Sequence, residues 1–191
     1  MNPARSVPDE LREPVIAVAR NALSAGAGAA VREPSAAELA PRLRVPGASF
    51  VSLYQEGRLR GCCGHLAPTG PLGLDVWRAA RASAYGDPRF PPVAAEEVTT
   101  LSMDVSILGE PEPVAARNEA ELRSVLRPEI DGLVVSFGER RATFLPQVWE
   151  TLPDPVDFLR ELRRKAGLPA DFWHETLRWS RYQVRVFRDP A

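Results

Sequence analysis

One short stretch of the chain concentrates the residue types that can do chemistry. Residues 59–65 read Leu-Arg-Gly-Cys-Cys-Gly-His and contain both cysteines of the protein. Side chains alternate between the two faces of an extended strand, so Arg58, Arg60 and Cys62 are expected on one face. A guanidinium beside a thiol favours the thiolate. Cys62 is therefore a candidate nucleophile or redox thiol, with Arg60 as its electrostatic partner.

A packing role for the same cysteine is an equally simple interpretation, because unpaired cysteine is among the most buried residue types. Leu59 marks the apolar side of the strand, so Cys63 is expected in the core. In an unbroken strand His65 shares the face of Cys63. It becomes a candidate base for Cys62 only if the chain turns at Gly64.

Disulfide and zinc chemistry are both disfavoured at the cysteine pair. Adjacent α-carbons lie about 3.8 Å apart, below the usual disulfide range of roughly 4.4–6.8 Å. Neighbouring cysteines on opposite faces of a strand cannot both reach one ion, and structural zinc generally needs four ligands. We therefore expect no metal site and reduced thiols. Among the 24 basic residues, Lys165 is the only lysine and so the only side-chain amine that could form a Schiff base.

Two further segments contribute candidate binding residues. The loop from Asp87 to Val93 reads Asp-Pro-Arg-Phe-Pro-Pro-Val, and its prolines restrict the backbone that carries Asp87 and Arg89. These two residues could support a substrate, or form an internal salt bridge that fixes the loop. Phe144 and Gln147 follow a second hairpin much as Gly64 follows the first. The predicted substrate-binding residues are Gly61, Gly64, Asp87, Arg89, Phe144 and Gln147.

The elements that must position these residues follow from periodicity and turn signals. Apolar residues at helical spacing predict helices over 14–25, 72–85 and 155–166. Alternation and glycine-containing turns predict hairpins over 49–63 and 133–145, a strand over 101–107 with one wet face, and a C-terminal strand over 182–187. The pattern indicates an α+β fold with antiparallel sheets and flanking helices, and a pseudo-duplication of hairpin-plus-helix units that would give two lobes.

Composition sets broad limits on the class of protein. With 191 residues, 45% hydrophobic and 26% charged, the chain is expected to form a single domain over 1–191. A net charge of −1 argues against nucleic-acid and membrane-surface binding. No stretch approaches the roughly 20 apolar residues of a membrane helix, and no signal-type run opens the chain. We expect a soluble, cytoplasmic protein.

Residues 59–65 resemble the Leu-Arg-Gly-Cys-Ile-Gly-Thr signature of the AMMECR domain family, also called AmmeMemoRadiSam system protein A. The segments at 87–93 and 144–149 follow in family order, and the resemblance runs from about Pro14 to Arg188. The chain departs from the signature at two positions. Cys63 stands where isoleucine is usual, and His65 stands where threonine is usual, which offers a base that the family pattern does not require.

The resemblance implies association with a Memo-type protein and a radical-SAM protein, in a modification pathway whose substrate and cofactor it leaves unnamed. Two functional hypotheses follow. The first is an enzyme or enzyme subunit that depends on Cys62, with Arg60 and His65 in support. The second is a non-catalytic binding or adaptor domain that presents the Arg60/Cys62 strand and the 87–93 loop to a small molecule, peptide or partner.

Overall fold

The computed structural model describes residues 9–190, which form two compact units. The first unit contains residues up to 108 together with the C-terminal segment from 185, and the second contains residues 109–184. The chain therefore leaves the first unit once and returns to it with its last strand. Each unit is built on its own four-stranded antiparallel sheet.

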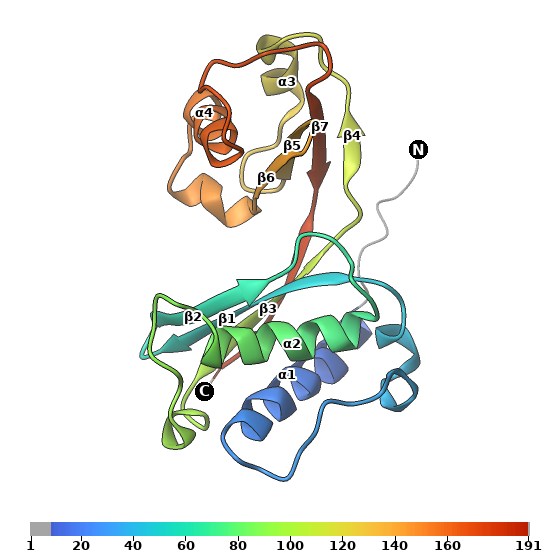
Figure 1. The fold of residues 1–191 in the computed structure, drawn as a ribbon, viewed down its shortest axis with the longest axis vertical. Helices are drawn as coiled ribbons and strands as arrows, with labels where there is room; N and C mark the ends of the chain where they lie inside the picture. Colours follow the sequence, from blue (N-terminus) through green and yellow to red (C-terminus); the bar gives the residue numbers. More distant parts are fainter. Residues whose placement is uncertain (1–8, 191) are drawn as a thin grey trace. The chain divides into compact units, whose positions relative to one another are not determined.

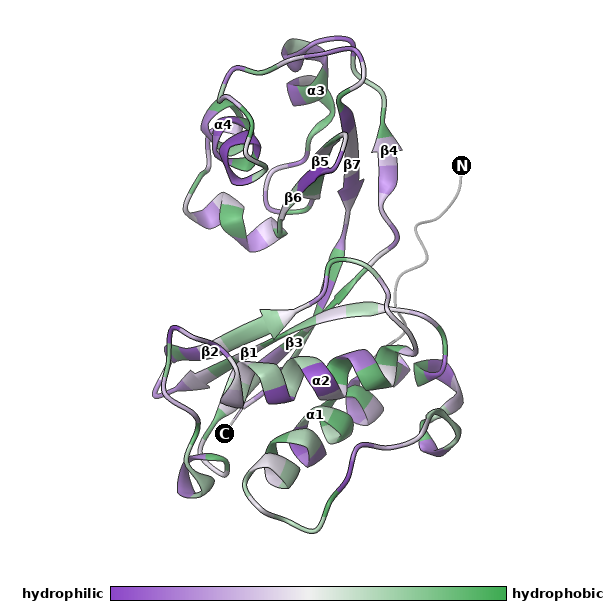
Figure 2. Ribbon diagram, viewed as in Figure 1, coloured by the Kyte–Doolittle hydropathy of each residue, from purple (hydrophilic) through white to green (hydrophobic). Residues whose placement is uncertain are grey.

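The first unit is a sheet with two helices on one face (Figure 1). The strand order is β2-β1-β3-β8. The elements are α1 Arg12–Gly26, β1 Ala48–Gln55, β2 Arg58–Gly64, α2 Leu72–Tyr85, β3 Ser102–Leu108 and β8 Val184–Asp189. Hydrophobic and hydrophilic residues alternate along α2 in Figure 2, as expected for a helix with one face on a core.

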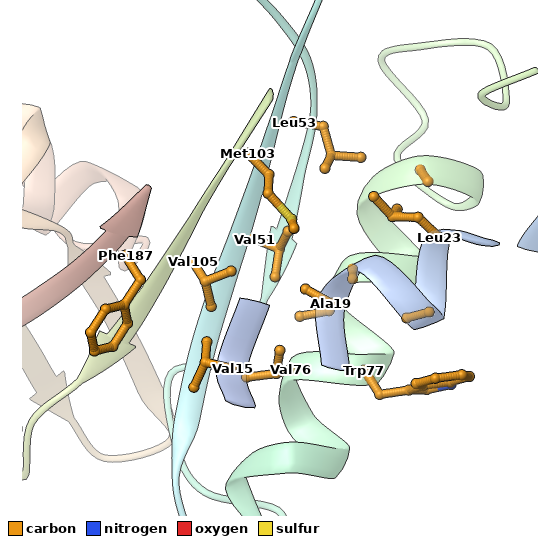
Figure 3. Packing of buried hydrophobic residues seen from close by; sticks show 14 of the residues in the cluster. Val15, Ala19, Leu23, Val51, Leu53, Val76, Trp77, Met103, Val105 and Phe187 are labelled. Atoms are coloured by element: carbon orange, nitrogen blue, oxygen red, sulfur yellow. The ribbon is translucent and has the colours of Figure 1, made fainter. Parts of the chain in front are cut away.

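Alternation along the strands explains which face of this sheet the helices cover. Val51, Leu53, Met103 and Val105 are almost fully buried and point toward α1 and α2 (Figure 3). Complete burial of such a side chain stabilises the fold by about 1.5–3 kcal/mol. Residues between them, such as Ser52, must then point to the opposite face.

The second unit has the strand order β4-β7-β5-β6. Its elements are β4 Glu112–Val114, α3 Glu119–Val125, β5 Gly132–Phe137, β6 Arg140–Phe144, α4 Pro155–Lys165 and β7 Arg178–Tyr182. Its separate core includes Phe158, which stacks on Trp149 at a ring distance of 3.7 Å. Each unit therefore has the buried cluster that it needs to be compact.

The predicted α+β fold with antiparallel sheets is confirmed, and the predicted helices and hairpins lie close to their expected positions. Three short elements were not anticipated: β4, α3 and β7. The C-terminal strand was predicted to begin at Tyr182, but Tyr182 ends β7 and β8 begins at Val184. Among residues 9–190, no helix combines the length and apolar character needed to cross a membrane.

A β-bulge in the first hairpin changes which residues share a face. Leu53 pairs with Gly61 and Tyr54 pairs with Leu59, so Arg60 is an extra residue with no partner in β1. Strict alternation had placed Leu59 on the core side together with Gly61. Leu59 is instead 40% exposed, because the extra residue reverses the alternation on its N-terminal side.

Candidate functional site

Cys62 lies on the face of the first sheet opposite the helices. Its cross-strand partner is Ser52, whose neighbours Val51 and Leu53 point into the core. The Ser52 hydroxyl donates a hydrogen bond to Cys62 Sγ at 3.3 Å. The Cys62 side chain is half-buried. The thiol is therefore outside the hydrophobic core, with a hydroxyl donor beside it.

The backbone of Cys62 is held by the side chains of Asp87 and Arg89. β2 is an edge strand, and the free edge of a strand presents unpaired N–H and C=O groups. Asp87 Oδ2 accepts from the Cys62 N–H at 2.9 Å, and Arg89 Nη2 donates to the Cys62 carbonyl at 3.2 Å. The loop side chains thus satisfy both outward-facing groups of the cysteine backbone.

Asp87 and Arg89 also bind each other tightly. Arg89 donates to the carboxylate through Nη2 at 2.7 Å and through Nε at 3.0 Å. These hydrogen bonds hold the pKa of Asp87 well below its usual range, although burial acts in the opposite direction. Asp87 and Arg89 therefore form the internal salt bridge that was the alternative interpretation of these residues. The same two side chains also hydrogen-bond to the backbone of Cys62.

Arg60, the expected electrostatic partner of Cys62, makes other contacts. Its guanidinium binds the Glu97 carboxylate through Nε at 3.0 Å and Nη2 at 3.1 Å, and donates to the carbonyls of Pro91 and Pro92. The hydrogen bonds from Arg60 lower the pKa of Glu97. Arg60 therefore fastens the proline-rich loop to the strand. Within the described part of the chain, no hydrogen bond joins its side chain to Cys62.

Arg89 supplies the positive charge near the thiols. Its pKa is raised mainly by its hydrogen bond to Asp87, and the charges of Cys62 and Cys63 act in the same direction. A cation within range of a thiol favours the thiolate. Arg89 is paired with Asp87, however, and at Cys63 the charge of Asp87 acts against that of Arg89.

Cys63 lies on the helix side of the sheet, as alternation predicts, but it is half-buried and outside the core cluster. Its N–H donates to Ser83 Oγ of α2 at 2.8 Å. Burial is the main cause of its raised pKa. Gly61 makes this close approach of α2 feasible, since a Cβ there would lie 1.9 Å from the Ser83 carbonyl oxygen.

His65 binds a buried carboxylate on the helix side. Its Nδ1 lies 2.9 Å from Asp75 Oδ1, in the first turn of α2. Asp75 is 1% exposed and also accepts from the N–H and the hydroxyl of Ser49, both at 2.7 Å. The turn at Gly64 that would bring His65 to the thiol is not formed. The His65 N–H instead donates to the Ser49 carbonyl and extends the pairing of β2 with β1. His65 and Cys62 therefore face opposite sides of the sheet.

The remaining predicted binding residues divide between the two units. Gly64 ends β2, where a Cβ would lie 2.2 Å from the Ser49 carbonyl oxygen, so its role is close packing. Phe144 and Gln147 belong to the second unit. Phe144 is half-buried and contacts the ammonium group of Lys165, while Gln147 is exposed. Gly61, Cys62, Asp87 and Arg89 are the predicted residues that come together.

Sequence reasoning missed three polar residues on the face of Cys62: Ser52, Tyr54 and Asp104. Asp104 of β3 pairs with Ser52, and its carboxylate lies 3.8 Å from Arg188 Nε. Burial raises the pKa of Asp104. The predicted wet face of the 101–107 strand already indicated that the Asp104 side chain lies outside the core. Which residue of β1 it pairs with is decided only by the fold. Within residues 9–190, no group of three or more His, Cys, Asp or Glu side chains is arranged to hold a metal ion.

The fold and the strand that contains Cys62 place the chain in a class of known proteins. A crystal structure of an uncharacterized protein, PH0010, from Pyrococcus horikoshii superposes with a TM-score of 0.81 at 31% identity, over 97% of this chain and 99% of that one. A protein of Methanothermobacter thermautotrophicus is 42% identical over 142 residues, 73% of this chain and 74% of its own length. Protein MJ0810 of Methanocaldococcus jannaschii is 36% identical over 142 residues, 71% of this chain and 69% of its own length.

The family model named AMMECR1 matches residues 16–187. The chain belongs to the AMMECR1 family, as the resemblance predicted.

Proposed function

We propose that this AMMECR1 protein is a cysteine-dependent enzyme or enzyme subunit in which the Cys62 thiol is the reactive group. One observation carries the proposal. The Asp87 and Arg89 side chains hold the N–H and the carbonyl of Cys62, while its sulfur accepts a hydrogen bond from Ser52. A nucleophile held in this way requires little reorganisation when it reacts.

The electrostatics support the same proposal. A hydroxyl donor and a nearby guanidinium both stabilise a thiolate relative to a thiol. Cys62 has the hydroxyl donor in Ser52, and the Arg89 guanidinium, which is paired with Asp87, also donates to the Cys62 carbonyl. Cys62 as a whole is half-buried rather than enclosed in the core.

The alternative is a non-catalytic binding or adaptor domain. It is favoured by the full engagement of Arg60 and Asp87 in internal contacts, which leaves neither free for a substrate. Leu59 and the side chain of Arg89, 40% and 56% exposed, would then contribute to the partner surface along β2. Memo-type and radical-SAM proteins are the partners that the family resemblance suggests for either function.

The rate of iodoacetamide labelling of the native protein as a function of pH tests the proposal. We expect Cys62 to label rapidly in the folded protein and Cys63 to label slowly. Cys62→Ser should abolish the fast reaction, and Cys63→Ser should retain it. If both thiols react only on unfolding, the enzyme proposal is wrong and the adaptor function takes its place.

A further inference from the structure

A buried arginine links three elements of the second unit. Arg163 belongs to α4, and its side chain is 1% exposed. Its Nη2 donates to the carboxylate of Glu119, the first residue of α3, and its Nη1 donates to the carbonyl of Ala170 in the segment after α4. The guanidinium also lies over the ring of Trp179 in β7, 5.7 Å from the ring centroid. Arg163 is therefore the junction of α3, α4 and β7.

Two hydrogen-bond donors at this junction find no acceptor among the described residues. Within residues 9–190, the buried side-chain nitrogen and oxygen atoms without a hydrogen-bond partner are Arg163 Nε and Trp179 Nε1. Buried polar groups are nearly always hydrogen-bonded, and leaving a donor unpaired is costly. The two side chains that carry these donors contact each other. One shared cause is the simplest account of two neighbouring unpaired donors.

The two donors cannot satisfy each other. Arginine Nε and tryptophan Nε1 each carry one N–H, and neither nitrogen can accept. The indole N–H lies in the plane of its ring, so the guanidinium over the ring face leaves it unpaired. A contact between an arginine N–H and an aromatic face is a weak substitute for a hydrogen bond. A third group must therefore accept from both nitrogens.

Charge and space decide the chemical class of that group. The guanidinium already has an anionic partner, because the Glu119 carboxylate binds it directly. A second anion would leave an uncompensated negative charge among buried side chains, where a charge without a partner is strongly disfavoured. Trp179 is 3% exposed, and the ring of Trp173 packs on it with the centroids 6.2 Å apart. These surroundings call for a small, neutral acceptor, and a water molecule is both.

We propose that the second unit binds one internal water molecule, whose oxygen accepts from Arg163 Nε and from Trp179 Nε1. Buried waters typically make about three hydrogen bonds to groups that the protein itself leaves unpaired. The water ties α4 to β7 by a hydrogen-bonded bridge, in addition to the contact between the guanidinium and the ring. Both donors belong to the second unit, so this site is distinct from the one proposed at Cys62.

The indole N–H of Trp179 allows a direct test in solution. The full chain is labelled with a nitrogen isotope, and magnetisation transfer from water to each indole N–H is measured by NMR, both as an NOE and as an ROE. Hydrogen exchange with the solvent gives the two signals the same sign, whereas a water held in place gives them opposite signs. We expect opposite signs at Trp179. Trp179→Phe assigns the signal, because the variant must lose it.

Trp149 provides the matched control in the same spectrum. It is also buried, but its Nε1 donates to the Asp131 carbonyl at 2.8 Å and needs no water. Its N–H should show no transfer from a bound water. If Trp179 behaves as Trp149 does, the proposal is overturned.

A crystal structure of the same chain gives a second measurement, which needs no variant and so remains decisive if Trp179→Phe does not fold. We expect a single density peak within about 2.7–3.2 Å of both nitrogens. A peak that contacts one nitrogen alone, or no peak at all, refutes the shared water. Soaking the crystal in bromide separates water from an anion, because bromide scatters anomalously. An anomalous peak between Arg163 and Trp179 would show an anion site and overturn the assignment to water.

Discussion

Replacing Asp87 by asparagine tests the brace, by which we mean the hydrogen bonds between the Asp87 and Arg89 side chains and the backbone of Cys62. The wild-type carboxylate accepts from the Cys62 N–H on Oδ2 and from the Arg89 N–H on Oδ1. Asparagine offers one oxygen, so either orientation of its amide turns an NH2 group toward one of these backbone donors. A buried donor without an acceptor costs about 1–3 kcal/mol. The Arg89 side chain, 56% exposed, can turn to water, so its share is small.

We therefore expect Asp87→Asn to lower the free energy of unfolding by about 2 kcal/mol. In urea the midpoint should fall by about 1 M, given a slope of roughly 2 kcal/mol per M for a chain of this size. The assay is circular dichroism in urea, together with hydrogen exchange at the Cys62 amide, which should lose protection. Asp171→Asn, at an exposed position, should stay within about 0.5 kcal/mol of wild type.

The pH dependence gives a second, independent signature of the same contact. Because the folded-state pKa of Asp87 is depressed, its contribution is fully present above the ordinary carboxyl value of about 3.9. The contribution is lost as pH falls from there toward the folded-state pKa. The stability difference between wild type and Asp87→Asn should therefore shrink in acid. Equal stability at neutral pH with unchanged Cys62 amide exchange would refute the brace.

Three further expectations follow from the same structure. Gly61→Ala should destabilise by about 1–3 kcal/mol in urea, because its Cβ would lie 1.9 Å from a backbone oxygen of α2. His65→Thr should leave the rate of Cys62 alkylation unchanged, because the two side chains face opposite sides of the sheet. Burial raises the pKa of Tyr182 to about 12, so this phenol should remain protonated in an ultraviolet titration until well above pH 10. The stability that it contributes should be lost as pH rises from about 10 toward 12.

Each of these has its own control. Gly70→Ala, where a Cβ meets nothing within 4 Å, should be nearly neutral, and equal effects at both glycines would contradict the packing argument. A slower Cys62 reaction in His65→Thr would show that the imidazole does reach the thiol. Three tyrosines titrating together near pH 10 would contradict the burial of Tyr182.

Local patterns in the sequence were sufficient for the helices and the hairpins. The helix predicted over 72–85 coincides with α2, because its apolar spacing and the preceding prolines are local signals. The first hairpin was predicted from its Glu-Gly turn, where both residues adopt positive φ. β4, α3 and β7 were missed because they are short, so their stability comes from packing rather than from periodicity.

The sequence alone determined the family, the α+β class and the importance of the strand that contains Cys62. Only the tertiary structure decided which groups surround the thiol. The bulge at Arg60 broke the alternation that sequence reasoning relied on, and the loop turned Arg60 toward Glu97 and Arg89 toward Cys62. Ser52 faces Cys62 within the first hairpin. Asp104 comes beside Ser52 through the pairing of β1 with β3, which lie far apart in the chain, and that register has no local signature.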